Sequence, residues 1–140
     1  MIKIMFVCTG NSCRSQMAEG LARKLGKGII EPYSAGIFPT EVHPSAIKVM
    51  KEIGIDISQQ KSKAIDIDLL NKMDVVITLC DNAREYCPVT PSQIKTIHWP
   101  IDDPVSASGN EKEIINAFRK TRNEIKKRIS ELIENITSKS

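Results

Sequence analysis

The sequence predicts a three-layer α/β domain built on a four-stranded parallel sheet with helices on its faces. Short apolar runs alternate with segments of helical periodicity, the pattern of parallel strands joined by crossover helices. The run from Ile2 to Val7 is apolar except for Lys3, as expected for a strand buried on both faces. The amphipathic segment from Asn110 to Lys139 predicts one long helix that covers the sheet.

The other elements follow from apolar periodicity and from the Gly and Pro residues that interrupt it. The expected strands are Ile29–Ala35, Asp74–Leu79 and Lys95–His98, and the expected helices run from near Ser12 to about Gly26, from His43–Pro44 to Gly54, over Ile67–Leu70 and over Asp81–Tyr86. In the first helix we expect Leu25 on the buried face, and we expect His43 to be a cap of the second helix or a surface residue. Residues 56–65 are expected to form a polar connection.

Length and composition limit the class of protein. A chain of 140 residues is long enough for one domain with a substantial core, so we take residues 1–140 as a single domain. No apolar run approaches the roughly 18 residues that cross a bilayer, and the chain opens directly into a strand rather than a signal peptide. We expect a cytoplasmic monomer that contacts no membrane.

The net charge of +3 comes from the end of the chain. Residues 111–140 hold eight Lys and Arg against five acidic residues, whereas the first 110 residues balance at twelve and twelve. The excess therefore lies on the solvated face of the last helix. A nucleic-acid surface needs a denser basic patch with aromatic residues, which make up only 4% of the chain, so nucleic acid is not an expected partner.

The turn between the first strand and the first helix carries the strongest chemical pattern. Its N–H groups and the positive helix end can surround a tetrahedral oxyanion, and Arg14 adds a bidentate clamp. The same field stabilises a thiolate, so Cys8 is expected to be the nucleophile, with Ser15 donating a hydrogen bond to its sulfur. The predicted oxyanion-binding loop is Thr9, Gly10, Asn11, Ser12, Cys13, Arg14 and Ser15. Cys13 has no local partner and is taken as a packing residue.

Two further cysteines flank the segment that follows the third strand. Cys80 should lie at the same sheet edge as Cys8, because the carboxyl ends of parallel strands meet there. If Cys80 and Cys87 cap one continuous helix, seven residues at ~1.5 Å each separate them by roughly 10 Å. A disulfide needs Cα atoms within about 7 Å, so joining the two requires this segment to bend or unwind. Neither cysteine spacing is the C-x2-C of structural zinc, and no metal is expected to be required.

Asp103 is the candidate general acid. It precedes Pro104 on a loop expected at the same sheet end, where a protonated carboxyl group can donate to a departing oxygen. Asp-Pro pairs are also common in turns, so the residues alone leave both roles open.

Three stretches together resemble the thioredoxin-coupled arsenate reductases, which share the fold of the low-molecular-weight protein tyrosine phosphatases. These stretches are Cys8–Ser15, Thr78–Cys80 with Cys87-Pro88, and Trp99–Pro104. The resemblance implies that Cys8 attacks arsenate, that Arg14 stabilises its charge and that Asp103 protonates the departing oxygen. It further implies a Cys8–Cys80 disulfide, then a Cys80–Cys87 disulfide that thioredoxin reduces, with phosphate and sulfate as competing oxyanions and no bound cofactor.

The resemblance also points to a potassium site formed by Asn11, Glu19 and Ser34. Some relatives complete it with an acidic residue where this chain has Lys63. We therefore expect the Lys63 ammonium to replace the cation, which would remove potassium dependence. Judged from the sequence pattern alone, Glu19 would be an ordinary solvated helix position.

Two other functions remain open at this point. A low-molecular-weight phosphatase would use Cys8, Arg14 and Asp103 through a phosphocysteine, but such enzymes carry a tyrosine after the Asp-Pro acid, where Val105 and Ser106 stand here. A non-enzymatic redox sensor would use Cys80 and Cys87 and would not need Asp103. Coupling to glutaredoxin instead of thioredoxin matches the Cys80–Cys87 spacing less well.

Overall fold

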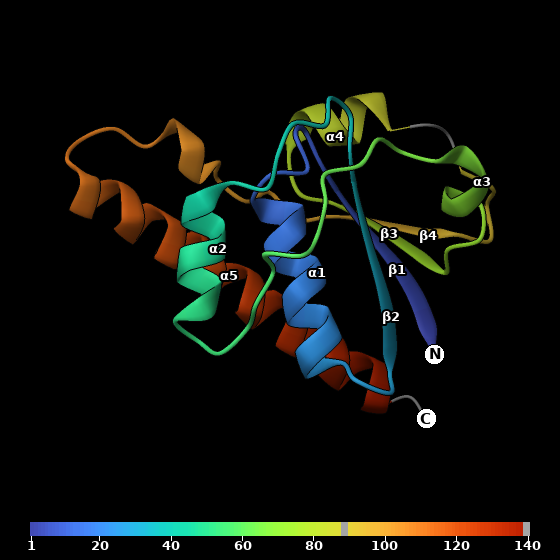
Figure 1. Cartoon of the computed structure of the whole chain (residues 1–140). Helices are drawn as coiled ribbons and strands as arrows, with labels where there is room; N and C mark the ends of the chain where they lie inside the picture. Colours follow the sequence, from blue (N-terminus) through green and yellow to red (C-terminus); the bar gives the residue numbers. More distant parts are fainter. Residues whose placement is uncertain (88–89, 139–140) are drawn as a thin grey trace.

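The computed structural model describes residues 1–87 and 90–138, which form a four-stranded sheet with helices on both faces (Figure 1). The strands are β1 (Ile2–Cys8), β2 (Ile30–Gly36), β3 (Val75–Thr78) and β4 (Lys95–His98), and the helices are α1 (Arg14–Leu25), α2 (Pro44–Lys51), α3 (Ile67–Leu70), α4 (Asp81–Tyr86) and α5 (Glu111–Ser138). The strand order is β2-β1-β3-β4 and every neighbouring pair is parallel, as predicted.

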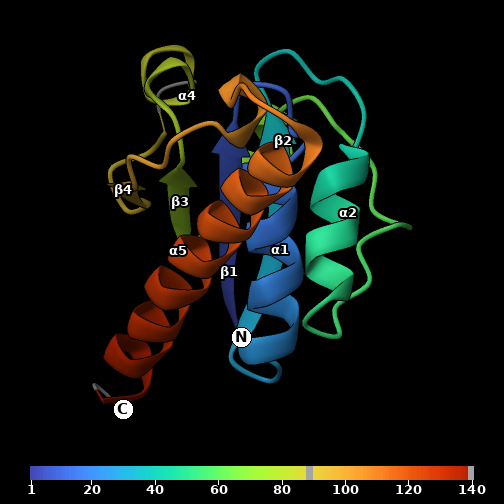
Figure 2. The ribbon, with the colours of Figure 1, turned by 90° about the vertical axis from the view of Figure 1, so that its left-hand side faces the viewer.

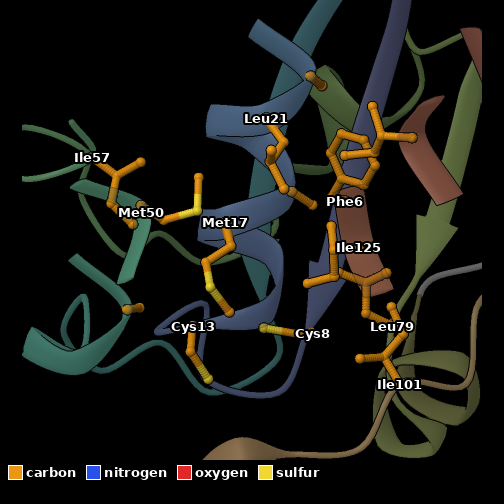
Figure 3. Close-up of a cluster of buried hydrophobic side chains, with 14 of the residues drawn as sticks. Phe6, Cys8, Cys13, Met17, Leu21, Met50, Ile57, Leu79, Ile101 and Ile125 are labelled. Atoms are coloured by element: carbon orange, nitrogen blue, oxygen red, sulfur yellow. The ribbon is translucent and has the colours of Figure 1, made fainter. Parts of the chain in front are cut away.

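The sheet separates two apolar clusters. Helices α1, α2 and α5 cover one face, with α1 and α5 side by side over β1 (Figure 2). Alternate residues of β1 point to opposite faces: Phe6 packs with α1 and α5 (Figure 3), whereas Met5 packs with α3 and α4. The predicted three-layer architecture is confirmed. Full burial of a side chain such as Phe6 stabilises the fold by about 1.5–3 kcal/mol. Because β1 buries side chains on both faces of the sheet, it holds the two helical layers together.

Helix α1 differs from its prediction at both ends. It begins at Arg14 rather than near Ser12, because Cys13 keeps a non-helical backbone with φ −133° and stays in the loop. At the other end Leu25 is 37% exposed, so its expected place on the buried face is wrong. Burial along α1 stops at Ala22, which places the last turn beyond the core.

The segment 56–65 is more than the polar connection expected from its composition. Ile57 is completely buried, and its Cγ2 atom lies only 2.7 Å from where a Cβ on Gly20 of α1 would be. The segment also pairs with the end of β2 through a bridge between Gly36 and Ala64. The burial of Ile57 was not predicted because an isoleucine followed by six polar residues carries no periodicity.

Helix α5 confirms the predicted apolar stripe. Phe118, Ile125 and Ile129 are buried, and Asn110 accepts a hydrogen bond from the Glu113 N–H at the helix start. Lys139, the predicted last residue of this helix, lies outside the described residues. No helix within the described ranges is both long enough and apolar enough to cross a membrane.

At the start of α2, His43 is the N-cap, and its side chain accepts a hydrogen bond from the Ser45 N–H.

The end of β2 lies directly against the loop that follows β1. A Cβ added to Gly36 would lie 2.8 Å from the Asn11 backbone nitrogen and 2.9 Å from the Thr9 carbonyl oxygen. Both are backbone atoms, so they can move only if the loop moves. The glycine therefore determines how closely strand and loop approach.

We expect Gly36→Ala to displace the loop and to destabilise the fold by about 1–3 kcal/mol, the usual cost of overpacking. Gly20→Ala is the matched control, since its methyl group would meet the side chain of Ile57 at 2.7 Å, away from the loop. Chemical denaturation measures the loss of stability in both variants, and the affinity for phosphate shows whether the loop has been displaced. Equal phosphate affinity in the two variants would contradict a specific effect on the loop.

Candidate active site

The backbone of the loop after β1 is held by its carbonyl oxygens. Four of these carbonyl oxygens accept hydrogen bonds of 2.8–3.2 Å from backbone N–H groups of segment 37–43: Cys8 from Ile37, Thr9 from Phe38, Gly10 from Thr40 and Ser12 from His43. The carbonyl oxygen of Asn11 accepts from the side chains of Gln16 and Ser62. In a trans peptide the N–H points opposite to the C=O. Five outward carbonyls therefore turn the N–H groups of residues 9–13 inward, which is the arrangement that binds an oxyanion.

Asn11 gives this loop its bend. Its φ of 48° is the only positive value of a non-glycine residue in the described part of the chain, and its side chain is fully buried. Its Nδ2 donates to Ser15 Oγ at 2.7 Å, and that hydroxyl lies 2.9 Å from Cys8 Sγ. Because Ser15 Oγ accepts from Asn11, its own proton is available to the Cys8 sulfur. The predicted contact between Ser15 and Cys8 is thus present.

Arg14 stands at the start of α1 with its side chain almost fully buried. Its Nη1 donates to the Ile101 carbonyl at 2.9 Å, and its Nη2 lies 3.7 Å from Asp103 Oδ2. Its Nε is buried and has no hydrogen-bond partner within residues 1–87 and 90–138. A buried guanidinium N–H without an acceptor is costly, and an oxyanion in the loop is the acceptor that its charge fits.

Asp103 lies opposite Arg14 at the mouth of the site. Its side chain is 38% exposed. Its Oδ1 accepts a hydrogen bond of 3.0 Å from the Val105 N–H, at the start of the Pro104–Ser106 turn. A pocket of about 230 Å³ is lined by Arg14, Cys80, Pro100, Ile101, Asp102 and Asp103. The structure therefore brings the candidate acid, the clamp and the second cysteine to one pocket.

Cys80 lies at the sheet edge predicted for it, beside the loop. It is the N-cap of α4, where its Sγ accepts from the Ala83 N–H at 3.3 Å. The same sulfur lies 3.1 Å from Thr9 Oγ1, which the sequence could not indicate because 71 residues separate the two. These two contacts tie the Cys80 sulfur both to the oxyanion-binding loop and to the first turn of α4.

Cys87 lies at the other end of α4, as its C-cap, and all four cysteines are free thiols. Burial raises the pKa of the Cys87 thiol. Among the α4 side chains whose burial is described, that of Ala83 is buried and those of Arg84 and Glu85 are exposed. The two thiols at opposite ends of one helix match the geometry from which rearrangement was predicted. Pro88 lies outside the described residues.

The residues expected to form the cation site lie together in a cluster beneath the loop. Glu19 is only 5% exposed, so its interpretation as a solvated position is wrong. Its carboxylate accepts from Ser34 Oγ at 2.6 Å and pairs with Arg23 at 2.9 Å and with Lys63 Nζ at 3.7 Å. Lys63 Nζ also lies 3.4 Å from Ser34 Oγ, and the Lys63 N–H donates to Asn11 Oδ1. The lysine ammonium thus lies against the groups that would hold a cation.

The Cys13 side chain is buried, with its Sγ 4.0 Å from Asp103 Oδ1. Its pKa rises to about 11, mainly through burial and then through the nearby Cys8 thiol and Asp103 carboxylate. A raised pKa keeps the group protonated until the pH approaches that value.

We expect the alkylation rate of Cys13 by iodoacetamide to stay low at pH 7–9 and to rise only as the pH approaches about 11. Peptide mass spectrometry of briefly alkylated protein measures this, with Cys80 in the same sample as the reference. Modification of Cys13 as fast as that of Cys80 at pH 8 would contradict the expectation.

Comparisons with known proteins agree with this geometry. The family model described as low molecular weight phosphotyrosine protein phosphatase matches residues 3–140. An arsenate reductase from Halalkalibacterium halodurans is 53% identical over 131 residues, covering 94% of each chain.

Two solved structures share the fold. A structure described as an arsenate reductase in the phosphate binding state is 42% identical, with a TM-score of 0.79 and coverage of 97% of this chain and 99% of that one. A thioredoxin-dependent arsenate reductase from Corynebacterium glutamicum is 26% identical, with a TM-score of 0.81 and coverage of 100% of this chain and 64% of that one. The chain therefore belongs to the low molecular weight phosphotyrosine protein phosphatase family, with arsenate reductases among its relatives.

Proposed function

We propose that this protein reduces arsenate to arsenite with the thiols of Cys8, Cys80 and Cys87, and that thioredoxin restores them. The observation that carries the proposal is the position of Cys80, whose sulfur lies 3.1 Å from the loop residue Thr9 and lines the pocket of Arg14 and Asp103. A phosphatase needs no second thiol there. The named activities of the relatives and of the structural neighbours support the same function.

The first half of the proposed reaction uses the loop. Cys8 attacks arsenic, Arg14 and the inward N–H groups balance the charge of the arsenate oxygens, and Asp103 gives its proton to the oxygen that leaves as water. Cys80 then attacks the Cys8 sulfur. The S–S bond forms as the S–As bond breaks, and the electron pair stays on arsenic, which leaves as arsenite.

The second half of the proposed reaction uses α4. Cys87 attacks Cys80, the Cys8 thiolate departs, and the disulfide now joins Cys80 to Cys87. This requires α4 to unwind, because its two ends are too far apart for a disulfide. Cys87 is half-buried as the C-cap of α4, so unwinding would also expose its thiol for the attack. Thioredoxin, a dithiol, reduces the new disulfide by exchange, as expected in a reducing cytoplasm. The protein acts as a monomer and needs no bound cofactor.

Hydrolysis of phosphate esters is the second candidate, favoured by the family match and by the shared loop, clamp and acid. Phosphate and arsenate have the same shape and charge, so Cys8 can form a phosphocysteine. After Asp103-Pro104 the exposed side chain is Val105, which offers no aromatic ring to stack on a phosphotyrosine. We propose at most a weak phosphatase activity.

The three-thiol relay predicts a distinct pattern of losses among single Cys-to-Ser variants. With arsenate, thioredoxin, thioredoxin reductase and NADPH, variants of Cys8, Cys80 and Cys87 lose steady-state arsenite release, whereas Cys13→Ser, the matched control, retains it. Without thioredoxin, Cys87→Ser still releases about one arsenite per chain, because Cys8 and Cys80 supply the two electrons. Asp103→Asn lowers turnover.

Opposite results would support the other functions. Phosphatase activity that survives the loss of Cys80 and Cys87, with no arsenite released by the parent, would establish the phosphatase. Full turnover in Asp103→Asn would contradict its role as the acid, and oxidation of Cys80 and Cys87 without any arsenate turnover would favour a redox sensor.

We further propose that the Lys63 ammonium replaces a potassium ion beneath the loop. The support is its position 3.7 Å from Glu19 Oε1 and 3.4 Å from Ser34 Oγ, which with Asn11 are the groups expected to hold the cation. Glu19 already pairs with Arg23, so its negative charge is balanced within the chain.

Exchanging sodium for potassium at constant ionic strength should leave the turnover of the parent unchanged. Lys63→Ala removes the ammonium and should make turnover rise with potassium, while Lys61→Ala, which leaves Nζ of Lys63 in place, serves as the control. Steady-state arsenite release in the two salts measures this. A large stimulation of the parent by potassium would refute the replacement.

A further inference from the structure

Gln16 is a completely buried amide in the first turn of α1 that no step above uses. Its Nε2 donates to the Asn11 backbone carbonyl at 3.0 Å and to Asn11 Oδ1 at 2.9 Å. The same nitrogen donates to the Lys61 carbonyl at 3.0 Å, and Gln60 Nε2 donates to Gln16 Oε1 at 2.7 Å. This side chain therefore joins the oxyanion-binding loop to the segment 60–63.

The orientation of the Gln16 amide follows from the backbone. The carbonyls of Asn11 and Lys61 can only accept, so the atom that faces both must be Nε2. The orientation of the Asn11 amide follows in the same way. The Lys63 N–H can only donate, so the atom that it meets at 2.9 Å is Oδ1. The Asn11 nitrogen is then left for Ser15 Oγ.

Asn11 Oδ1 accepts from two donors. One is Gln16 Nε2, and the other is the N–H of Lys63, whose segment is held both by Gln16 through the Lys61 carbonyl and by β2 through the Gly36 N–H, which donates to the Lys63 carbonyl. With its oxygen engaged twice, the Asn11 amide cannot flip. Its nitrogen must donate to Ser15, whose hydroxyl proton is then free for the Cys8 sulfur. A serine that donated elsewhere would leave that thiolate with one hydrogen bond fewer.

We propose that Gln16 is a positioning residue for the nucleophile, because it fixes the direction of the hydrogen-bond chain from Asn11 through Ser15 so that this chain ends in a donor to Cys8. The inference rests on the proposed function of Cys8 as the attacking thiolate. Gln16 does not touch the oxyanion and acts only through Asn11 and Ser15.

The pH dependence of Cys8 alkylation tests this proposal without arsenate or thioredoxin. Peptide mass spectrometry after timed iodoacetamide treatment gives the rate at Cys8 and the pH at which it is half-maximal. Gln16→Met keeps the size of the side chain and removes its donors. We expect that midpoint to rise by about one pH unit, since a hydrogen bond to a charged group is of that order.

Two comparisons separate positioning from packing. Gln60→Met is the matched control: it removes the hydrogen bonds of Gln60 with Gln16 Oε1, with the Gln16 carbonyl and with Arg23, but it leaves the donors on Gln16 Nε2, so the midpoint should stay at the parent value. Ser15→Ala should raise the midpoint as Gln16→Met does, and combining the two should add nothing, because both act on one chain of hydrogen bonds.

An unchanged midpoint in folded Gln16→Met would overturn the proposal, as would an equal shift in Gln60→Met or additive shifts with Ser15→Ala. If Gln16→Met does not fold, Gln16→Leu, which is also uncharged and cannot donate a hydrogen bond, is measured in its place. If the parent protein does not reduce arsenate, the proposed function is wrong, but the pH midpoint of Cys8 alkylation can still be measured and still tests the role of Gln16.

Discussion

The outward anchoring of five loop carbonyls is the constraint on which the rest of the site depends. An isolated turn after β1 would leave its peptide groups free to rotate, and the N–H groups would have no common direction. Segment 37–43 supplies backbone donors on one side, and Gln16 and Ser62 supply side-chain donors on the other. Each anchoring bond stabilises the fold by only about 0.5–1.5 kcal/mol, but together they aim the opposite ends of five peptides into one concavity.

The two sides of the proposed chemistry differ in how firmly they are held. The loop is packed against Gly36 and tied to three separate segments, so it offers a fixed geometry for binding and for the first attack. Helix α4 has only six residues, so few backbone hydrogen bonds must break for it to unwind. Because α1 and α5 form the opposite layer, α4 can rearrange without disturbing the main core (Figure 2). A fixed loop beside a weakly held helix suits a reaction in which one sulfur stays and another must travel.

Charge is balanced inside the site by side chains of the chain itself. Arg14 lies between Asp103 and the carbonyls of Leu79 and Ile101, so its guanidinium is oriented but not fully satisfied, and it keeps Nε for a ligand. Below the loop, the buried carboxylate of Glu19 is met by Arg23, Lys63 and the Ser34 hydroxyl. A buried charge without such partners would cost several kcal/mol, so this cluster belongs to the support of the loop as much as to its chemistry.

The sequence by itself determined the sheet, the helices and the chemical residues of the loop, because these depend on apolar periodicity and on residue types close together in the chain. It also placed Cys8 and Cys80 at one edge, since parallel strands end on the same side. Only the tertiary structure decided which distant groups meet. The contact between Thr9 and Cys80, the burial of Glu19, the exposure of Leu25 and the bonds from Gln16 to segment 60–63 join residues whose spacing carries no signal. Local patterns determine local structure, whereas the partner of a buried polar group is chosen by whichever segment the fold brings within hydrogen-bond distance.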